Sequence, residues 1–259
     1  MVYITISLLF TAATLGLLGP IILWHRLTQM GDALSHSIMF SLVIRYFFDL
    51  GQTSSTILVA LIFAFLLEFG ARDQRLDGGA KVVSLSCLLI SSTIIISDLA
   101  DGKIRIKEFL LGDAMALSYD QMKMSIVIFF LVAAFFVIYY KKIILSVTSR
   151  DFAKVMGVNV LRINLAVKIM LCLTIALAAN VIGILLVSSL LVIPASMARL
   201  ISKSPVQMTI ISCLISSLAG VLSIFISLNY DVSYGPCLAL MLSSSYVIMI
   251  SYSSLLKRY

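Results

Sequence analysis

The chain has 259 residues, of which 61% are hydrophobic and 12% are charged, with a formal net charge of +7 and a mean hydropathy of +1.11. Soluble domains carry about 25% charged residues, so this composition excludes a soluble domain. The apolar stretches are continuous, which excludes a β-barrel, whose strands alternate apolar and polar residues. The sequence therefore predicts an all-α, polytopic membrane protein that forms a single domain over residues 1–259.

Hydropathy along the chain predicts about nine transmembrane helices, with eight to ten as the range. The predicted spans are residues 3–23, 33–48, 54–70, 80–97, 124–141, 166–186, 187–203, 207–228 and 236–255. Residues 104–117 fit a re-entrant or interfacial helix. The first span has no basic segment before it, which favours a retained helix over a cleaved signal peptide.

Lysine and arginine residues are concentrated in alternate connections between the predicted spans. These connections are 24–32, 71–81, 142–165 and 199–206, together with the C-terminal Lys257 and Arg258. The positive-inside rule places them in the cytoplasm, which explains the basic charge without a nucleic-acid partner. The four cysteines are scattered and form no Cys-x-x-Cys pair, so neither a disulfide framework nor a thiolate metal site is predicted.

The first polar motif lies between the first two spans, at residues 31–36. Asp32 and His36 are four residues apart, so they share one helix face with Cβ atoms about 5–6 Å apart. A carboxylate and an imidazole can bind zinc, manganese or iron, but zinc takes about four ligands, so a second copy of the chain would supply the others. Alternatively, Asp32 is the N-cap of a helix that begins at Ala33. The other histidine, His25, is interpreted as an interfacial residue without a metal role.

The longest cytoplasmic connection, 142–165, contains a predicted short helix. Thr148 and Asp151 have the spacing of a capping box, and Gly157 suits a C-terminal end, which predicts about two helical turns at the inner surface. The apolar side chains of this helix are Phe152, Val155 and Met156, next to the basic Arg150. Such a helix either binds in a groove of a partner or rests on lipid headgroups.

Pro194 lies inside the predicted span 187–203 and is followed by Arg199. A proline in a membrane helix indicates either a kink that helps the helices to pack or a moving gate. Motifs for other functions are absent from the sequence: it contains no GxxxxGK[ST] nucleotide loop, no HExxH and no GxSxG. The chain is therefore predicted not to be an enzyme.

Taken together and in order, four motifs resemble those of the integral-membrane permeases of bacterial zinc/manganese ABC importers. They are Gly31–His36 (GDxLxH), Phe109–Asp113 (FLxGD), Ser189–Arg199 (SLLxIPAxxAR) and Tyr230–Pro236 (YD…GP). The resemblance covers almost the whole chain with matching spacing. It implies the type II ABC importer fold and a location in the bacterial inner membrane.

The resemblance also implies partners and site residues. The partners are a second permease copy, a cytoplasmic ATPase dimer that hydrolyses ATP, and an extracytoplasmic metal-binding protein. Asp32 and His36 are implied as metal ligands, and residues 149–160 as the coupling helix that contacts the ATPase through Arg150, Asp151, Phe152, Val155, Met156 and Gly157. Gating or structural roles are implied for Gly31, Gly112, Asp113, Pro194, Arg199, Asp231, Gly235 and Pro236.

The predicted function is import of zinc as a transported substrate, with no permanently bound cofactor. Some manganese-type relatives have a Pro-Gly stretch after the histidine, whereas this chain has Ser37–Phe40 there, which favours zinc over manganese or iron. A secondary transporter driven by an ion gradient is the alternative, but Glu68 is its only candidate carboxylate and no internal repeat is evident. The predicted span 33–48 puts Asp32 at the cytoplasmic edge, so either the helix begins earlier or the site is an inner gate.

Overall fold

The structure is a computed structural model, and it describes residues 2–25, 27–70, 78–100, 118–230 and 232–256. The described residues form helices and no strands. In chain order the helices are α1 (Val2–His25), α2 (Thr28–Ser37), α3 (Phe40–Phe48), α4 (Gln52–Gly70), α5 (Gly78–Leu99), α7 (Tyr119–Thr148), α8 (Arg150–Val155), α9 (Val160–Ile182), α10 (Ile184–Ile201), α11 (Pro205–Tyr230) and α12 (Tyr234–Leu256). The predicted all-α fold is confirmed for this part of the chain.

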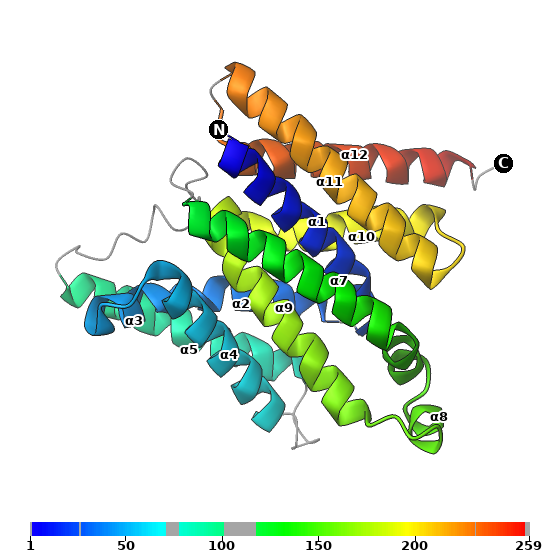
Figure 1. Cartoon of the computed structure of the whole chain (residues 1–259), viewed down its shortest axis with the longest axis horizontal. Coiled ribbons are helices and arrows are strands. Elements are labelled where there is room, and N and C mark those ends of the chain that lie inside the picture. Colours follow the sequence, from blue (N-terminus) through cyan, green and yellow to red (C-terminus); the bar gives the residue numbers. More distant parts are fainter. Residues whose placement is uncertain (1, 26, 71–77, 101–117, 231, 257–259) are drawn as a thin grey trace.

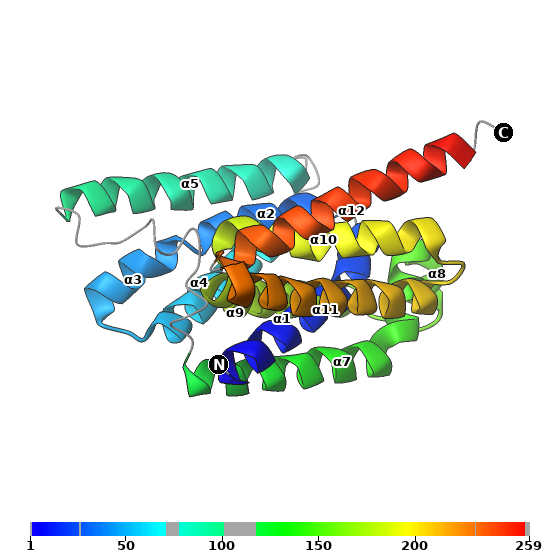
Figure 2. The same ribbon diagram turned by 90° about the horizontal axis from the view of Figure 1, so that it is seen from above.

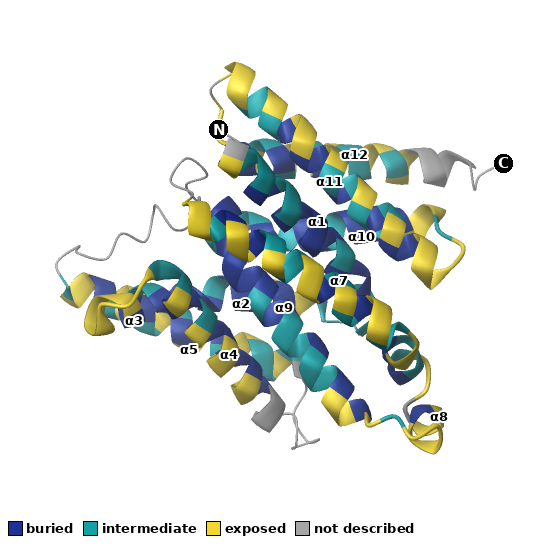
Figure 3. Ribbon diagram, viewed as in Figure 1, coloured by how far each residue is buried: buried dark blue, intermediate teal, exposed yellow. Residues whose placement is uncertain are grey.

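Helix α1 lies in the middle of the molecule and packs against α7, α9, α10 and α11 (Figure 1). Helices α3, α4 and α5 lie to one side of this centre, and α11 and α12 lie to the other. Viewed from above, α5 and α12 lie on one face, whereas α7 lies on the opposite face (Figure 2). Buried residues are concentrated on α1, α9 and α10, while the outer helices alternate buried and exposed positions (Figure 3).

Small residues allow α1 to approach its neighbours closely. A Cβ atom added to Gly16 would lie 2.7 Å from the Ser216 side chain on α11, and one added to Gly19 would meet the Leu191 carbonyl on α10. Ser216 also donates a 2.5 Å hydrogen bond to the Ala12 carbonyl. Such contacts between small residues are typical of helix pairs that pack without a hydrophobic driving force in lipid.

Six of the described helices are long and apolar enough to cross a membrane, namely those at Tyr3–His25, Gly79–Leu99, Tyr119–Thr148, Val160–Ile182, Pro205–Tyr230 and Tyr234–Ser251. Helices α4 and α10 contain the shorter apolar stretches Gln52–Leu67 and Leu186–Ile201. The count of about nine spans therefore stays a prediction. The re-entrant helix predicted for 104–117 lies outside the described residues.

Several predicted boundaries differ from the structure, and three of the differences have a clear cause or consequence. The span 33–48 is not one helix but two, α2 and α3, which meet at Ile38–Met39. The boundary expected after residue 186 lies at Gly183, because this residue has a φ of 95° that ends α9. Helix α7 is longer than the predicted span 124–141, because Ser118 and Gln121 form a capping box that starts it early.

Candidate functional site

The polar motif predicted from sequence lies inside α2 and not at its start. The N-cap of α2 is Leu27, whose side chain cannot accept a hydrogen bond, and the helix begins at Thr28. Asp32 is therefore in the second turn, and its interpretation as the N-cap of a helix beginning at Ala33 is wrong. Asp32 lies about a turn after the start of α2, and whether the site is an inner gate stays a prediction.

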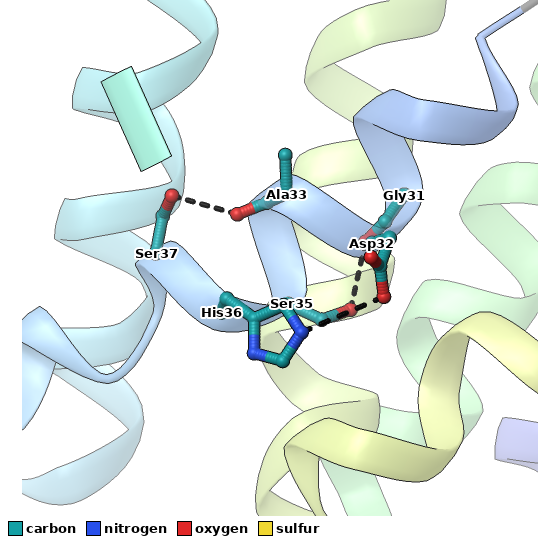
Figure 4. Close-up of polar contacts among 6 residues, drawn as sticks. All are labelled: Gly31, Asp32, Ala33, Ser35, His36 and Ser37. Atoms are coloured by element: carbon teal, nitrogen blue, oxygen red, sulfur yellow. Dashed lines mark hydrogen bonds and ion pairs between the residues drawn. The ribbon is translucent and has the colours of Figure 1, made fainter. Parts of the chain in front are cut away.

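Asp32 and His36 contact each other as the spacing predicts. The His36 Nε2 atom lies 3.6 Å from the Asp32 Oδ1 atom, and the two side chains point toward each other in Figure 4. The side chains are 62% exposed for Asp32 and 32% exposed for His36. Both are thus accessible to an ion from the same side of the helix.

The buried serines of α2 bond to carbonyls of the same helix. Ser35 and Ser37 each donate a hydrogen bond to the carbonyl four residues earlier, on Gly31 at 2.8 Å and on Ala33 at 2.7 Å (Figure 4). A Cβ atom on Gly31 would lie 2.9 Å from the Leu191 side chain, so this glycine lets α2 pack against α10. The packing fixes which face of α2 presents Asp32 and His36.

No third ionisable ligand joins the pair within the described ranges. Among these residues, no group of three or more His, Cys, Asp or Glu side chains could bind a metal ion. One chain thus offers one carboxylate and one imidazole, which is fewer than the about four ligands of a closed zinc site. The arrangement suits transient contact with an ion, or a site completed by groups from another chain.

The helix break at Ile38–Met39 follows His36 directly. Met39 donates its amide hydrogen to the His36 carbonyl at 3.1 Å, and Ser41 donates to the Ile38 carbonyl at 2.9 Å. These are bonds between residues three apart, which are typical of a 3₁₀ turn and not of an α-helix. Irregular backbone in a membrane helix is often found at binding sites.

The short helix predicted in the cytoplasmic connection is present as α8. Its N-cap is Ser149, whose side chain accepts a 3.3 Å hydrogen bond from the Phe152 amide. The capping box predicted for Thr148 and Asp151 is wrong, because Thr148 is still part of α7 and donates to the Ile144 carbonyl. Gly157 has a φ of 73° and ends the segment as expected.

Helix α8 lies at one end of the molecule (Figure 1). Phe152, Val155 and Met156 are 54%, 83% and 62% exposed. Asp151 contacts Lys154 at 3.7 Å, and both of these side chains are exposed. The side chain of Arg150 lies outside the described residues. An apolar surface of this kind on a connecting helix is available to a partner or to lipid.

The remaining residues singled out from sequence lie at other helix ends. Pro194 is inside α10, Arg199 is in the last turn of α10, and Pro236 is in the first turn of α12, where its missing amide hydrogen breaks no helix bond. A Cβ atom on Gly235 would clash with Leu186 and lie 2.8 Å from the Ile182 carbonyl. Gly112, Asp113 and Asp231 lie outside the described residues.

A chain of hydrogen-bonded polar side chains joins α3, α4 and α9, and no sequence pattern predicted it. Arg45 donates to Gln52 Oε1 at 2.6 Å, Gln52 Nε2 donates to Asn180 Oδ1 at 3.4 Å, and Asn180 Nδ2 donates to Thr56 Oγ1 at 3.0 Å. Asn180 lies in a long apolar segment, and an isolated amide in such a segment needs partners. That feature could have indicated the site from sequence, although not its partners.

Comparison with known proteins gives one family and a consistent set of relatives. The model of the ABC 3 transport family matches residues 1–253. The high-affinity zinc uptake system membrane protein ZnuB of Buchnera aphidicola subsp. Baizongia pistaciae is 30% identical over 247 residues, which are 95% of this chain and 94% of that protein. The manganese transport system membrane protein MntC of Halalkalibacterium halodurans is 22% identical over 239 residues, which are 92% of this chain and 82% of that protein.

A solved structure has the same fold. PsaBC from Streptococcus pneumoniae, determined in complex with a Fab, contains a chain that superimposes with a TM-score of 0.83 at 21% sequence identity. The superposition covers 95% of this chain and 89% of that chain. At this identity the likeness establishes the fold alone. The arrangement of helices described above therefore also occurs in a solved structure.

Proposed function

The chain belongs to the ABC 3 transport family, and from this premise we propose that it is the membrane permease of an ATP-driven importer whose substrate is zinc. The observation that supports this most directly is the Asp32–His36 pair, with Nε2 and Oδ1 3.6 Å apart on one helix. Imidazole and carboxylate together suit zinc, whereas magnesium and calcium prefer oxygen ligands alone. The 30% identity to a protein named for zinc uptake favours the same metal.

The metal would bind Asp32 and His36 only transiently. Transport requires binding that is favourable enough for the ion to enter and weak enough for it to leave. Ligands shared between two chains can be separated again more easily than a closed site of four on one chain. The buried hydroxyls of Ser35 and Ser37 are already bonded to carbonyls of α2.

The exposure of Asp32 supports assembly with a second copy of the chain. A carboxylate that is 62% exposed on a membrane helix cannot face lipid without a large cost in free energy. Covering it with the same face of a second permease would remove it from lipid and bring two carboxylates and two imidazoles together. The pair would then reach the about four ligands that zinc usually takes.

Energy for transport would come from a separate ATPase that binds α8. The sequence has no GxxxxGK[ST] loop, so ATP hydrolysis is assigned to a partner subunit. The exposed side chains of Phe152, Val155 and Met156 would insert into a groove of that subunit, with Arg150, Asp151 and Gly157 shaping the segment. An extracytoplasmic binding protein would deliver the metal.

The proposal is tested by ATP-dependent uptake of zinc, manganese and iron into liposomes that contain the permease, its ATPase and its binding protein. Zinc uptake should fall by about 10²-fold or more in Asp32→Ala and His36→Ala, because each removes half of one copy's ligands. Gln29→Ala is the matched control, since Gln29 is an exposed residue of the same helix. Full zinc uptake by the His36→Ala variant would contradict the role of His36 as a metal ligand.

Manganese is the second candidate substrate, because a protein named for manganese transport is 22% identical over most of the chain. If the same liposomes took up manganese but not zinc, the chain would still be an importer permease and its substrate would be manganese. Uptake that needs an ion gradient and no ATP would instead indicate a secondary transporter. The three outcomes are distinct in one assay.

A further inference from the structure

Helix α7 has an exposed face that is apolar along most of its length and carries a lysine near each end. Lys123 and Lys141 are exposed, and the exposed residues between them are all apolar. The most exposed of these apolar residues are Val127, Phe130, Val137 and Ile138. A helix rises about 1.5 Å per residue, which puts the two lysines about 27 Å apart. This length matches the hydrocarbon core of a bilayer, which is about 30 Å thick.

The exposed face of α5 is different, because it includes the side chains of Ser84, Cys87 and Ser91. Helices α5 and α7 lie on opposite faces of the molecule (Figure 2). Helix α2, which carries Asp32 and His36, packs against α5, whereas α7 packs against α1, α8 and α9. A second copy that covers Asp32 would therefore leave the exposed face of α7 open. Lipid is the partner that fits this face, because the face is apolar and as long as a bilayer core is thick.

Tyrosine rings lie beside the lysines at both ends of this face. At the outer end, the Lys123 Nζ atom lies 4.2 Å from the centre of the Tyr119 ring, and this ring contacts Tyr3 of α1 edge-on with their centres 5.4 Å apart. At the inner end, the Lys142 Nζ atom lies 5.4 Å from the centre of the Tyr139 ring. Tyrosine and lysine at the ends of an apolar helix are typical of residues in the headgroup layers. The two pairs therefore mark where α7 enters and leaves the bilayer core.

The two ends of α7 differ in charge. At the outer end, the Lys123 Nζ atom lies 3.6 Å from the Asp120 carboxylate, so the two charges offset each other. At the inner end, Lys141 and Lys142 are both exposed, and neither has a carboxylate partner among the residues that the structure describes. The cytoplasmic leaflet of a membrane contains anionic lipids, which attract basic residues at its surface. The inner end of α7 is therefore suited to a negatively charged headgroup, and the outer end is not.

The inner end of α7 is also joined directly to α8. Ser149 is both the C-cap of α7 and the N-cap of α8, so no loop separates the two helices. From Lys141 to Thr148 the helix extends by about 10 Å, and a headgroup layer is about 5–7 Å thick. Helix α8 thus lies just beyond the headgroups, where a partner can reach its exposed side chains. A change in the depth of α7 in the membrane would displace α8 by the same amount.

We infer that Lys141 and Lys142 bind the phosphate groups of anionic phospholipids at the inner surface of the membrane, and that this contact sets the height of α8 above the membrane. The ammonium groups donate hydrogen bonds to the phosphate, while the acyl chains of the same lipid lie along the apolar face of α7. The lipid site depends on α7 alone. Its effect on transport rests on the proposed function, in which α8 binds the ATPase.

The lipid site is tested by tryptophan fluorescence, because the chain has a single tryptophan, Trp24. In a Trp24→Phe background, Ile138→Trp puts the fluorophore on the exposed face of α7 one turn before Lys142, and Val127→Trp puts it on the same face nearer the outer end. Each variant is reconstituted in phosphatidylcholine vesicles with increasing amounts of brominated phosphatidylglycerol or brominated phosphatidylcholine, which quench a tryptophan that they touch. At Ile138→Trp the anionic lipid should bind about fivefold more tightly than phosphatidylcholine. At Val127→Trp the two lipids should quench equally.

Charge variants show whether the two lysines cause the preference. Lys141→Gln and Lys142→Gln together should abolish the preference at Ile138→Trp, whereas Lys141→Arg and Lys142→Arg together should keep it, because a guanidinium also binds phosphate. Lys123→Gln is the matched control, since it removes a lysine that is already paired with Asp120, and it should leave the preference unchanged. Equal quenching by the two lipids at Ile138→Trp, or a preference that survives the double glutamine variant, would overturn the lipid site.

The effect on transport is measured with the complete importer in liposomes with and without phosphatidylglycerol. ATP-dependent zinc uptake by the unmodified chain should be about fivefold faster with the anionic lipid, and the double glutamine variant of Lys141 and Lys142 should be slow in both liposomes. Equal uptake by the unmodified chain in both liposomes, with the lipid preference at Ile138→Trp present, would overturn the effect on α8 and leave the lipid site standing. Absence of metal uptake by the unmodified importer would instead overturn the proposed function, while the quenching would still decide the lipid site.

Discussion

The breaks between α9 and α10 and between α2 and α3 differ in what causes them. Between α9 and α10 the interruption is the single residue Gly183, with φ 95° and ψ 149°. Only glycine adopts that region readily, and the flanking Ile182 and Ile184 are 1% and 0% exposed. Between α2 and α3 the interruption is a 3₁₀ turn whose angles suit any residue. The first break has a backbone conformation that needs glycine. The second break differs from a continuous α-helix only in its hydrogen bonds, which join residues three apart instead of four.

The two interruptions differ in backbone geometry and not in burial. The α9–α10 interruption lies between fully buried residues, and both of its helices pack against α1. The α2–α3 interruption is buried as well, since Ile38 and Met39 are 0% and 5% exposed, and it lies beside the more exposed pair that we propose as the metal site. A buried break in a helix therefore needs a glycine only where the backbone leaves the right-handed region.

The largest expected effect is at Gly183. Gly183→Ala should lower the free energy of unfolding by about 3 kcal/mol, because a Cβ atom is strained at this φ and the buried neighbours cannot move aside. Unfolding in mixed micelles with increasing SDS measures the change. Gly157→Ala is the matched control, since Gly157 has φ 73° but no atom within 4 Å of an added Cβ, and its loss should be about 1 kcal/mol. Equal losses of stability in Gly183→Ala and Gly157→Ala would contradict this explanation of the break at Gly183.

The next effect is at Gly235, which packs on the same break from α12. An added Cβ atom would meet the Leu186 side chain and lie 2.8 Å from the Ile182 carbonyl. Gly235→Ala should therefore lower the free energy of unfolding by about 2 kcal/mol through overpacking. The nearest atom to a Cβ at Gly51 is the Ser54 hydroxyl at 3.9 Å, so Gly51→Ala should change the stability by less than about 0.5 kcal/mol. An unchanged free energy of unfolding in Gly235→Ala would mean that the packing of α12 does not stabilise the α9–α10 break.

Sequence patterns predicted the helical membrane fold and the Asp32–His36 contact, because both depend on residues close together in the chain. They did not locate either break. Gly183 lies in a continuous apolar run, and hydropathy is insensitive to a single backbone angle. The turn at Ile38–Met39 contains no glycine or proline, so no residue type indicates it. The bond between Gln52 and Asn180 joins residues 128 positions apart, which only the packed structure brings together.

At the α2–α3 break the expected effect is smaller and has the opposite sign. Ser41→Ala should raise the free energy of unfolding by about 1 kcal/mol, because it removes a buried hydroxyl that has no partner. Ser37→Ala, which loses a 2.7 Å hydrogen bond to the Ala33 carbonyl, should lower it by a similar amount. The same SDS titration measures both variants. A loss of stability in Ser41→Ala would indicate that its hydroxyl is satisfied.

The smallest expected effect tests whether the two breaks are connected. Gln52 bonds both to Arg45 on α3 and to Asn180, which lies one turn before Gly183 on α9. A double-mutant cycle of Arg45→Met and Asn180→Leu should therefore give a coupling free energy of about 0.5 kcal/mol. Asn159→Ala at the far end of α9 replaces Asn180→Leu in the control cycle and should give no coupling. A measurable coupling would mean that this chain of polar side chains connects α3 to α9 beside Gly183. No coupling would mean that the two breaks are energetically independent.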